Sequence, residues 1–261
     1  MTATLRGRWS VDPCVVADGL DERGMVCLEG AVSQEWLADA VAEVRRYLQV
    51  HGEQFHLVDR TPGDTECPTV DSVAHDPDTL RFLTQVVRAR LPEHAADPRT
   101  FRPRLRIVAG QVGGTDAFSF HYDAEAVTLV VPIILPDSPR GRAGELVGQF
   151  NKRPFRRSVL ANLFDKLIGL SVFYRWLLLR NDGARTTTAE WRVGNAYLFW
   201  GYRSLHGLSP VAPGAVRATL VMHFGLPHGS NRVLATAAGL RHAISPGPRR
   251  HAEHAPTQDR P

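Results

Sequence analysis

Residues 126–135 read AVTLVVPIIL, a short run of β-branched and aliphatic side chains that is typical of a buried strand. Similar runs recur between residues 101 and 225, separated by Gly, Pro and Asp. They are FRPRLRIVAG (101–110), FSFHYD (118–123), GELVGQF (144–150), EWRVG (190–194), NAYLFWG (195–201) and VRATLVMHFG (216–225). Many short strands with turn residues between them predict an antiparallel sandwich or barrel.

The segment before this β-rich region predicts helices that could cover one sheet. GMVCLEG (24–30) indicates a short strand, and Ser33 is placed to cap a helix that follows it. Residues 51–79 are polar and rich in Pro and Asp, which favours loops and short turns. Residues 79–90 again predict a helix, which ends before Pro92. In the first helix, apolar side chains recur at helical spacing at Trp36, Leu37, Ala40, Val41, Val44 and Leu48.

Two further segments set the domain limits. SVLANLFDKLIGLSVFYRWLLLR (158–180) is strongly apolar and predicts a helical insertion around residues 155–180 that packs on the barrel. A lid over the pocket, a dimer interface or a membrane-surface contact by residues 158–180 are the alternatives. We expect one domain over residues 1–230, with a helical part at about 20–95 and a β core at about 101–228. Residues 231–261 are expected to form a disordered tail.

Composition favours a soluble globular protein, with 43% hydrophobic and 22% charged residues. Lys152 and Lys166 are the only lysines, so the net charge of +4 reflects an arginine-rich composition more than nucleic-acid binding. The three cysteines form no CxxC pair, which favours reduced thiols in the cytoplasm. No secretory signal and no apolar run long enough to span a membrane are evident. The oligomeric state is expected to be a monomer or homodimer.

The stretch FSFHYD places a histidine and an aspartate two residues apart. Alternate residues of a strand share a face, so His121 and Asp123 are predicted to point to the same side. About one His-x-Asp pair is expected by chance in a chain of this composition, so the pair is weak evidence alone. A third ligand is available in GNAYLFWGYRSLHG, where His206 follows an apolar strand. Two histidines and one carboxylate form the facial triad of non-haem Fe(II) oxygenases, which leaves coordination positions open.

An arginine downstream of His206 is a candidate for binding a carboxylate near this site. In VRATLVMHF, strand alternation puts Arg217, Thr219, Val221 and His223 on one face. A guanidinium binds a carboxylate through two hydrogen bonds, and the hydroxyl of Thr219 can add a third. Binding of 2-oxoglutarate needs this combination, because its keto-acid end chelates iron while its distal carboxylate needs a cation. Thr128 and Arg106 are further candidates for this pocket, although no motif fixes them.

Together these features resemble the Fe(II)/2-oxoglutarate-dependent dioxygenases, particularly their phytanoyl-CoA dioxygenase-like branch. The resemblance rests on GMVCLEGAVSQEWLADAVAEVR, HYD, NAYLFWGYRSLHG and the arginine after them. It implies a double-stranded β-helix (a jelly-roll, cupin-like fold) with helices on one side. The ligands it implies are His121, Asp123 and His206 for iron and Arg217 for 2-oxoglutarate. Many members carry a serine two residues after the distal histidine, whereas this chain has Leu208 there and Ser209 next.

The resemblance also implies a reaction. An enzyme of this kind uses Fe(II), 2-oxoglutarate and O2 to hydroxylate or desaturate an unactivated C–H bond of a small metabolite, in a biosynthetic pathway. Retention of Asp123 argues against halogenation, because halogenating members replace that carboxylate with a small residue. The basic stretch NKRPFRRS (151–158) is interpreted first as a solvated charge cluster, and recognition of an anionic or carrier-bound substrate is the functional alternative. Candidate substrate contacts are Tyr122, Arg106, Arg153 and Trp200.

Two alternatives stay open at this point. A demethylase or hydroxylase of the same superfamily that acts on nucleic acid or protein would also use the triad. The nucleic-acid branch usually carries a second arginine six residues after the first, where this chain has His223, so no nucleic-acid partner is expected. A non-catalytic jelly-roll binding protein is the other alternative, and the presence of the triad together with Arg217 disfavours it.

Overall fold

The computed structural model describes residues 9, 11–61, 65–112, 117, 119–139, 141–155 and 187–227. Its α-helices are α1 (Pro13–Arg23), α2 (Gln34–His51), α3 (Pro68–Ala74) and α4 (Pro77–Arg88). Short 3-10 turns are η1 (Glu93–Ala96), η2 (Pro98–Thr100) and η3 (Gly110–Val112). The strands are β1 (Met25–Leu28), β2 (His56–Asp59), β3 (Arg102–Val108), β4 (Val127–Ile134), β5 (Leu146–Gln149), β6 (Thr187–Thr188), β7 (Ala196–Phe199), β8 (Leu205–Leu208) and β9 (Arg217–Phe224).

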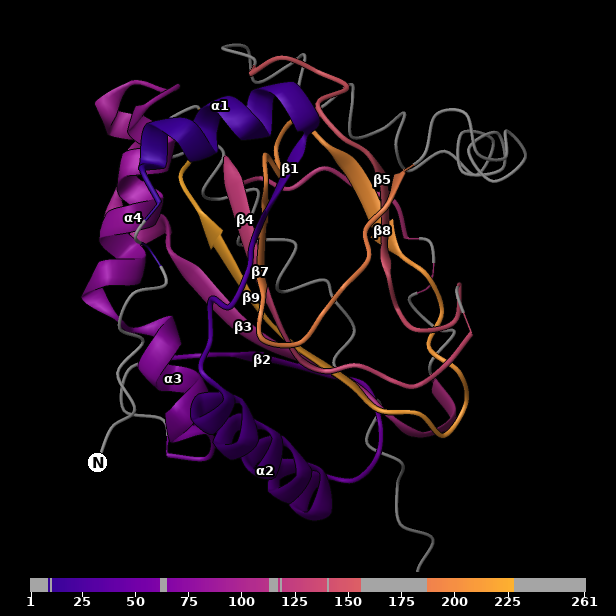
Figure 1. Cartoon of the computed structure of the whole chain (residues 1–261). Helices are drawn as coiled ribbons and strands as arrows, with labels where there is room; N and C mark the ends of the chain where they lie inside the picture. The colour runs from indigo at the N-terminus through magenta and orange to yellow at the C-terminus, as the bar shows by residue number, and fades with distance from the viewer. Residues whose placement is uncertain are drawn as a thin grey trace, which may run out of the picture. The chain divides into compact units, whose positions relative to one another are not determined.

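The strands form two antiparallel sheets (Figure 1). The large sheet has the order β1-β7-β4-β9-β3-β2, and the small sheet has the order β6-β5-β8. Neighbours such as β4 and β9 are far apart in sequence, so the fold depends on long-range pairing rather than on simple hairpins. A mainly β architecture with flanking helices is therefore confirmed.

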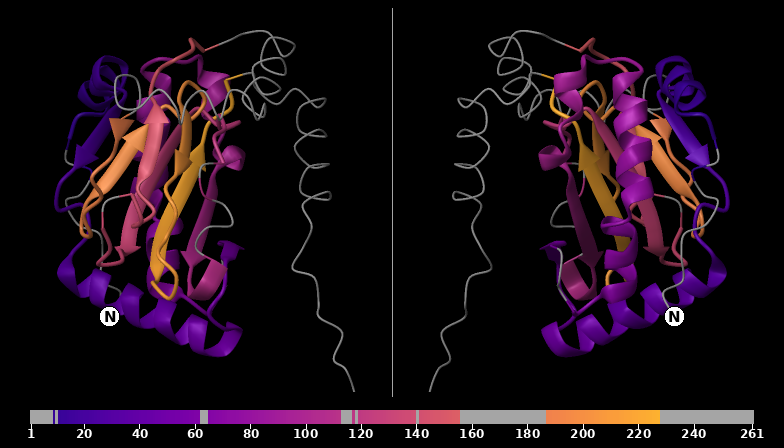
Figure 2. Two further views of the ribbon diagram at one scale, coloured as in Figure 1. Left: turned by 90° about the vertical axis from the view of Figure 1, so that its right-hand side faces the viewer. Right: turned by 90° about the vertical axis from the view of Figure 1, so that its left-hand side faces the viewer.

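The helices cover one face of the large sheet (Figure 2). The hydroxyl of Ser33 accepts a hydrogen bond from the Trp36 amide at 3.1 Å, which caps α2 as predicted. The predicted second helix is α4, capped by Asp76 and begun by Pro77. The apolar stripes of both helices belong to the main core, which also contains the sheet residues Leu105, Ile107, Leu129, Leu220 and Met222.

The prediction of loops over residues 51–79 is wrong, because β2 and α3 lie there. Buried polar pairs stabilise this segment, and this explains why its polar composition led to the wrong prediction of loops. Arg60 forms two hydrogen bonds to the Asp71 carboxylate, at 2.7 and 2.8 Å. The Glu43 carboxylate accepts hydrogen bonds from the Thr69 and Val70 amides at the start of α3. These groups satisfy one another inside the protein, so polarity here does not mean exposure.

Two predicted strands are also corrected. Residues 119–123 of the FSFHYD stretch do not form a strand: His121 alone of these makes a single β-bridge, and its partner is His206. Residues 190–194 are not a strand either, since they lead into the turn before β7. The Tyr197 hydroxyl holds that turn, accepting from the Arg192 amide at 2.7 Å and donating to the Glu190 carbonyl at 3.0 Å. A side chain of β7 thus takes up main-chain groups that a strand would have paired.

The large sheet has two chemically different faces. On β9 the helix-facing side chains Ala218, Leu220, Met222 and Phe224 are fully buried in the main core. The other face carries Arg217, Thr219, Val221 and His223, as alternation predicted. A second apolar cluster, of Val130, Leu146, Ala189 and Phe199, joins this inner face to the small sheet. The site described below lies on this inner side.

Several predictions concern residues outside the described ranges. They are the helical insertion around 155–180 with its alternatives, most of the second half of the basic stretch 151–158, and the tail 231–261. In the part of the chain that the structure describes, no helix has the length and apolar character needed to cross a membrane.

Candidate metal and cosubstrate site

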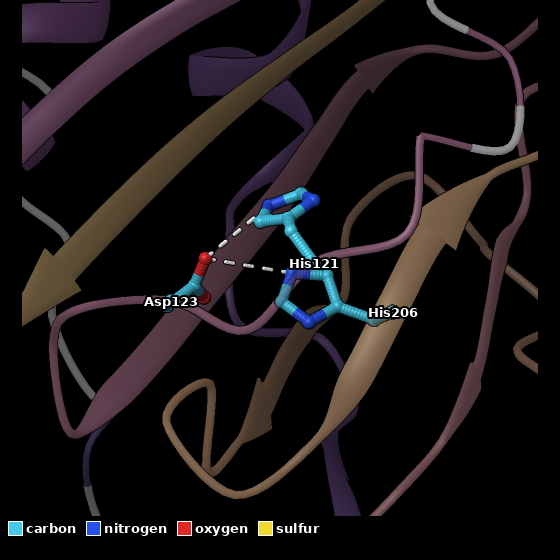
Figure 3. A group of neighbouring side chains, drawn as sticks. All are labelled: His121, Asp123 and His206. Atoms are coloured by element: carbon cyan, nitrogen blue, oxygen red, sulfur yellow. Dashed lines mark ion pairs between the residues drawn. The ribbon is translucent and has the colours of Figure 1, made fainter. Parts of the chain in front are cut away.

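A backbone bridge brings the two candidate histidines together (Figure 3). His121 lies in the segment between β3 and β4, and His206 lies on β8. The His121 amide donates to the His206 carbonyl at 2.9 Å, and the His206 amide donates back at 3.0 Å. As a result the two imidazole rings lie 4.6 Å apart, centre to centre. The predicted convergence is therefore achieved by one bridge between the segment that precedes β4 and strand β8 of the small sheet.

Asp123 completes the cluster. Its Oδ1 lies 3.4 Å from Nε2 of His121 and 3.6 Å from Nε2 of His206. The three ligand atoms all lie within 4.8 Å of one another. Metal–ligand bonds of about 2.1 Å place neighbouring ligand atoms about 3 Å apart, so a small contraction would close this group on a divalent cation. The donor set, two imidazoles and one carboxylate, is the set that suits Fe(II) with open positions.

Main-chain carbonyls set the orientation of both imidazoles. Nδ1 of His121 lies 2.9 Å from the Ser119 carbonyl, and Nδ1 of His206 lies 3.0 Å from the Ser204 carbonyl. A carbonyl oxygen can only accept, so each Nδ1 carries the proton and each Nε2 keeps its lone pair. This is the tautomer that a metal ligand needs, and the same hydrogen bonds fix the ring planes.

The second oxygen of the Asp123 carboxylate is held by the large sheet. Thr128 on β4 donates its hydroxyl hydrogen bond to Oδ2 at 2.5 Å, and Nδ1 of His223 on β9 lies 3.6 Å from the same oxygen. A Cβ at Gly201 would lie 2.2 Å from Oδ2, so this position has room for glycine alone. Oδ1 is thereby left facing the histidines. Thr128 thus positions Asp123, and its predicted contact with the cosubstrate stays a prediction.

The electrostatics favour the ligand forms of Asp123 and His206. For His121, burial would lower the pKa, but the neighbouring Asp123 carboxylate outweighs burial and raises it. Burial alone would raise the pKa of Asp123, but the neighbouring His206 and His223 outweigh it and hold that pKa well below its usual range. Burial lowers the pKa of His206 to about 4, with partial compensation from Asp123. At neutral pH Asp123 is therefore ionised and His206 is neutral, as metal binding requires. The His121 side chain is 51% exposed, so the cluster is open to solvent on that side.

Arg217 lies buried at the other end of the inner face of β9, with 1% of its surface exposed. Among the described residues, neither its Nε nor its Nη1 has a hydrogen-bond partner, and the buried Thr219 hydroxyl also has none. Burial and the charge of Arg106 lower the pKa of Arg217 to about 9, so the guanidinium stays charged at neutral pH. A buried cation with two unsatisfied donors is costly unless an anion binds to it.

The turn before β5 is shaped around this guanidinium. Gly144 has φ +70° and a Cβ there would lie 2.3 Å from Cδ of Arg217, so a side chain at 144 would displace the arginine. The adjacent Glu145 is engaged elsewhere: its carboxylate accepts from the Gly141 amide at 2.7 Å and from the Ser209 hydroxyl. Ser209, the serine displaced by one position from the family pattern, is thus committed to Glu145.

The candidate substrate residues have different surroundings. The Arg153 guanidinium lies between the rings of Tyr122 and Tyr202, 3.9 and 4.1 Å from their centres, and its Nε donates to the Tyr202 carbonyl at 2.6 Å. These contacts tie the HxD segment to the β7–β8 connection. Trp200 is fully buried and its indole donates to Asp21 at 3.0 Å, which gives it a packing role and argues against a substrate contact. Arg106 lies on the inner face of β3, opposite Thr219.

Sequence reasoning did not assign a role to three residues of this site. His223 was on the predicted inner face, and its contact with Asp123 could have been inferred only from knowing which strands pair. Gly144 and Gly201 give room to neighbouring side chains, and a single glycine in a turn carries no signal of what approaches it. In each case the role depends on a contact between residues that are far apart in the sequence.

Comparison with known proteins identifies structures that share the fold of this chain. No family model matches the sequence, and no curated protein matches it. The structure is similar to a prolyl 4-hydroxylase from Phytophthora capsici, with a TM-score of 0.57, 16% identity, and 92% of this chain and 74% of that chain covered. It is similar to a Pseudomonas putida prolyl-4-hydroxylase (TM-score 0.52, 14% identity, 82% and 99% covered). It is also similar to SnoN, a non-haem α-ketoglutarate-dependent epimerase from nogalamycin biosynthesis. Here the TM-score is 0.50 and the identity 17%, with 95% of this chain and 95% of that chain covered. At such identities the likeness concerns the fold, and it confirms the predicted jelly roll.

Proposed function

We propose that this chain is an Fe(II)- and 2-oxoglutarate-dependent oxygenase. Nε2 of His121, Oδ1 of Asp123 and Nε2 of His206 would hold the iron, and Arg217 with Thr219 would bind the distal carboxylate of 2-oxoglutarate. The observation that carries the proposal is a cluster of two imidazoles and a carboxylate on the inner side of the large sheet, where Arg217 is also buried with two nitrogen atoms that have no hydrogen-bond partner among the described residues. Bound together, iron and 2-oxoglutarate would supply the oxygen activation that C–H oxidation needs.

The surrounding residues would keep this site in its binding geometry. The Ser119 and Ser204 carbonyls hold the two imidazoles, and Thr128 holds the carboxylate, so the ligands need little reorganisation when a metal enters. The unpartnered donors of Arg217 and Thr219 would be satisfied by a carboxylate through charge-assisted hydrogen bonds. The exposed side of His121 would leave an approach for oxygen and substrate.

The reaction we propose is hydroxylation or desaturation of a small metabolite. The carboxylate ligand Asp123 supports this choice over halogenation, because the position that a halide would need is filled. The three thiols, Cys14, Cys27 and Cys67, are free, which supports work in a reducing cytoplasm. Assignment to the phytanoyl-CoA dioxygenase-like branch stays a prediction from the sequence motifs.

The direct test is turnover of 2-oxoglutarate. Purified chain with Fe(II), ascorbate and O2 is expected to form succinate slowly without added substrate, and His121→Ala is expected to abolish that formation while the protein stays folded. His94→Ala provides a matched control, because His94 is an exposed histidine outside the site. Normal succinate formation by His121→Ala, or none by the wild-type protein, would refute the proposal.

A further inference from the structure

A row of three side chains crosses the inner face of the large sheet next to the metal cluster. Thr128 on β4 lies opposite Phe199 of β7 on one side and opposite His223 of β9 on the other. Opposed residues of neighbouring strands share a face. The Phe199 ring makes a T-shaped contact with the ring of His206, with 4.8 Å between the ring centres. Phe199 thus supports a ligand imidazole, and the other two residues of the row lie beside the ligand carboxylate.

His223 reaches the Asp123 carboxylate through Thr128. Its Nδ1 lies 3.2 Å from Oγ1 of Thr128, which is within hydrogen-bonding distance. The same Nδ1 lies 3.6 Å from Oδ2 of Asp123, which is too far for a hydrogen bond. Oγ1 of Thr128 lies 2.5 Å from that Oδ2. The three side chains therefore form a chain of two hydrogen bonds that ends on the carboxylate.

The protons in this chain can be arranged in one direction only. The ionised Asp123 carboxylate accepts hydrogen bonds and donates none, so the single hydroxyl proton of Thr128 is donated to it. The Thr128 oxygen then has only lone pairs left for His223, and Nδ1 of His223 must be the donor. This holds whether or not Nε2 of His223 also carries a proton. His223 thus fixes the direction of the Thr128 hydroxyl, and hydrogen bonds in such a chain strengthen one another.

The hydrogen bond between Thr128 and Asp123 is enclosed by the protein. The Asp123 side chain is 5% exposed, and Thr128 is fully buried. The Asp123 amide donates to the Gly201 carbonyl at 3.1 Å, and a Cβ at Gly201 would lie 2.4 Å from Oγ1 of Thr128. The main chain at Gly201 therefore lies against this hydrogen bond. In so buried a place a hydrogen-bond chain is stronger than in water, and the loss of one member costs more.

We propose that His223 is a positioning residue for the metal site: through Thr128 it holds Oδ2 of Asp123, so that Oδ1 is the oxygen presented to the metal. Oδ1 is the atom that lies 3.4 and 3.6 Å from Nε2 of the two ligand imidazoles. The role rests on the proposed oxygenase function, since Asp123 needs this fixed orientation as a metal ligand. A carboxylate that binds through one oxygen leaves more coordination positions open than one that binds through both.

The hydrogen-bond chain can be tested in the metal-free protein. Long-range proton–nitrogen NMR spectra of the histidine rings report which ring nitrogen carries a proton, and His223→Asn identifies the His223 signals. We expect a proton on Nδ1 of His223, and we expect its signals to shift in Thr128→Val, which removes the acceptor. A wild-type protein without a proton on this Nδ1, or an unchanged Nδ1 signal in Thr128→Val, would overturn the proposal. This measurement does not depend on metal binding.

Three substitutions of His223 separate positioning from packing. Asparagine places an amide nitrogen near the position of Nδ1, glutamine places one near the position of Nε2, and leucine has the shape of asparagine without a donor. His223→Leu and His223→Gln should each weaken Co(II) binding by about tenfold or more, whereas His223→Asn should stay within about threefold of the wild type. His75→Leu is the matched control, because His75 is a half-buried histidine outside the site, at the end of α3. It should bind Co(II) like the wild type.

A double substitution tests the route through Thr128. If His223 acts through the hydroxyl, Thr128→Val combined with His223→Leu should bind Co(II) within about twofold of Thr128→Val alone. Losses that multiply in the double variant would overturn the proposal, as would equal binding by the leucine and asparagine variants or restoration by glutamine instead of asparagine. Wild-type binding that His121→Ala abolishes, with equal affinities in all His223 variants, would overturn this role alone. Absence of Co(II) binding by the wild type would overturn both this role and the proposed function.

Discussion

The two faces of β9 bury side chains of opposite chemical character. Towards the helices, Ala218, Leu220, Met222 and Phe224 are fully buried and apolar, and they contribute to a continuous core. Towards the small sheet, the same strand buries a guanidinium and a hydroxyl whose donors have no partner among the described residues. One face thus stabilises the fold, whereas the other retains polar groups at a cost in stability. The difference indicates that the inner face is shaped for a ligand.

Arg217→Met gives the largest expected effect. The variant keeps the side-chain length but removes the cation, so 2-oxoglutarate affinity should fall by about 2–5 kcal/mol, the loss typical of one partner of a buried charged pair. The free energy of unfolding of the ligand-free protein should rise, because an uncompensated buried charge is removed. Calorimetric titration and chemical denaturation check the two effects. A destabilised variant with unchanged affinity would contradict the contrast between the faces.

Leu220→Ala probes the other face of the same strand. Leu220 is fully buried, so its truncation should lower the free energy of unfolding by about 2–5 kcal/mol through lost apolar contacts and a cavity. The affinity of the folded protein for 2-oxoglutarate should stay within about twofold of the wild type, because the side chain points away from the site. Denaturation and titration at low temperature measure both. Comparable loss of affinity in this variant and in Arg217→Met would show that the faces are not independent.

Thr128→Val tests the positioning of Asp123 from the inner face of β4. Loss of the hydroxyl frees Oδ2 of the carboxylate, so Fe(II) affinity should fall by about 10–100-fold, as for other groups that orient metal ligands. Thr128→Ser keeps the hydroxyl and should restore most of the affinity. Anaerobic Fe(II) titration, with Co(II) spectra as a check on ligand geometry, distinguishes this role from a structural one. Equal affinities in the valine and serine variants would exclude it.

Thr219→Val should have the smallest effect. The substitution preserves shape and removes one unpartnered hydroxyl, so 2-oxoglutarate affinity should fall by about 0.5–1.5 kcal/mol, the net value of one hydrogen bond. The ligand-free protein should become slightly more stable, again opposite in sign to Leu220→Ala. Isothermal titration and the unfolding midpoint provide the two readings. Tighter cosubstrate binding in the valine variant would remove Thr219 from the proposed site.

The alternation of side chains along a strand made the difference between the two faces of β9 largely predictable from the sequence. A period of two along VRATLVMHF assigned Arg217 and Thr219 to one face before any pairing was known. The cap at Ser33 and the helical stripe after it likewise follow from local rules, and the structure confirms them. Strand spacing predicted only an antiparallel sandwich or barrel. The jelly roll was predicted from the family resemblance, because strand order itself leaves no local trace in the sequence.

The failures share one cause. In residues 51–79 buried pairs such as Arg60 with Asp71 replace the apolar pattern that marks an ordered segment. The segment around His121 has the alternation of a strand, yet the β-pairing of its described residues is limited to one bridge with His206. The Thr128 hydroxyl and the Trp200 indole donate to Asp123 and Asp21, and neither contact was predicted from the sequence. Partners distant in the sequence decide each case, and composition does not reveal them.

A crystal structure of the chain grown anaerobically with Mn(II), as a redox-inert substitute for Fe(II), and 2-oxoglutarate tests the central claim most directly. We expect one metal ion bonded to Nε2 of His121, Oδ1 of Asp123 and Nε2 of His206, with the distal carboxylate of 2-oxoglutarate bound by Arg217. Metal bound at other residues, or 2-oxoglutarate bound away from Arg217, would contradict the account.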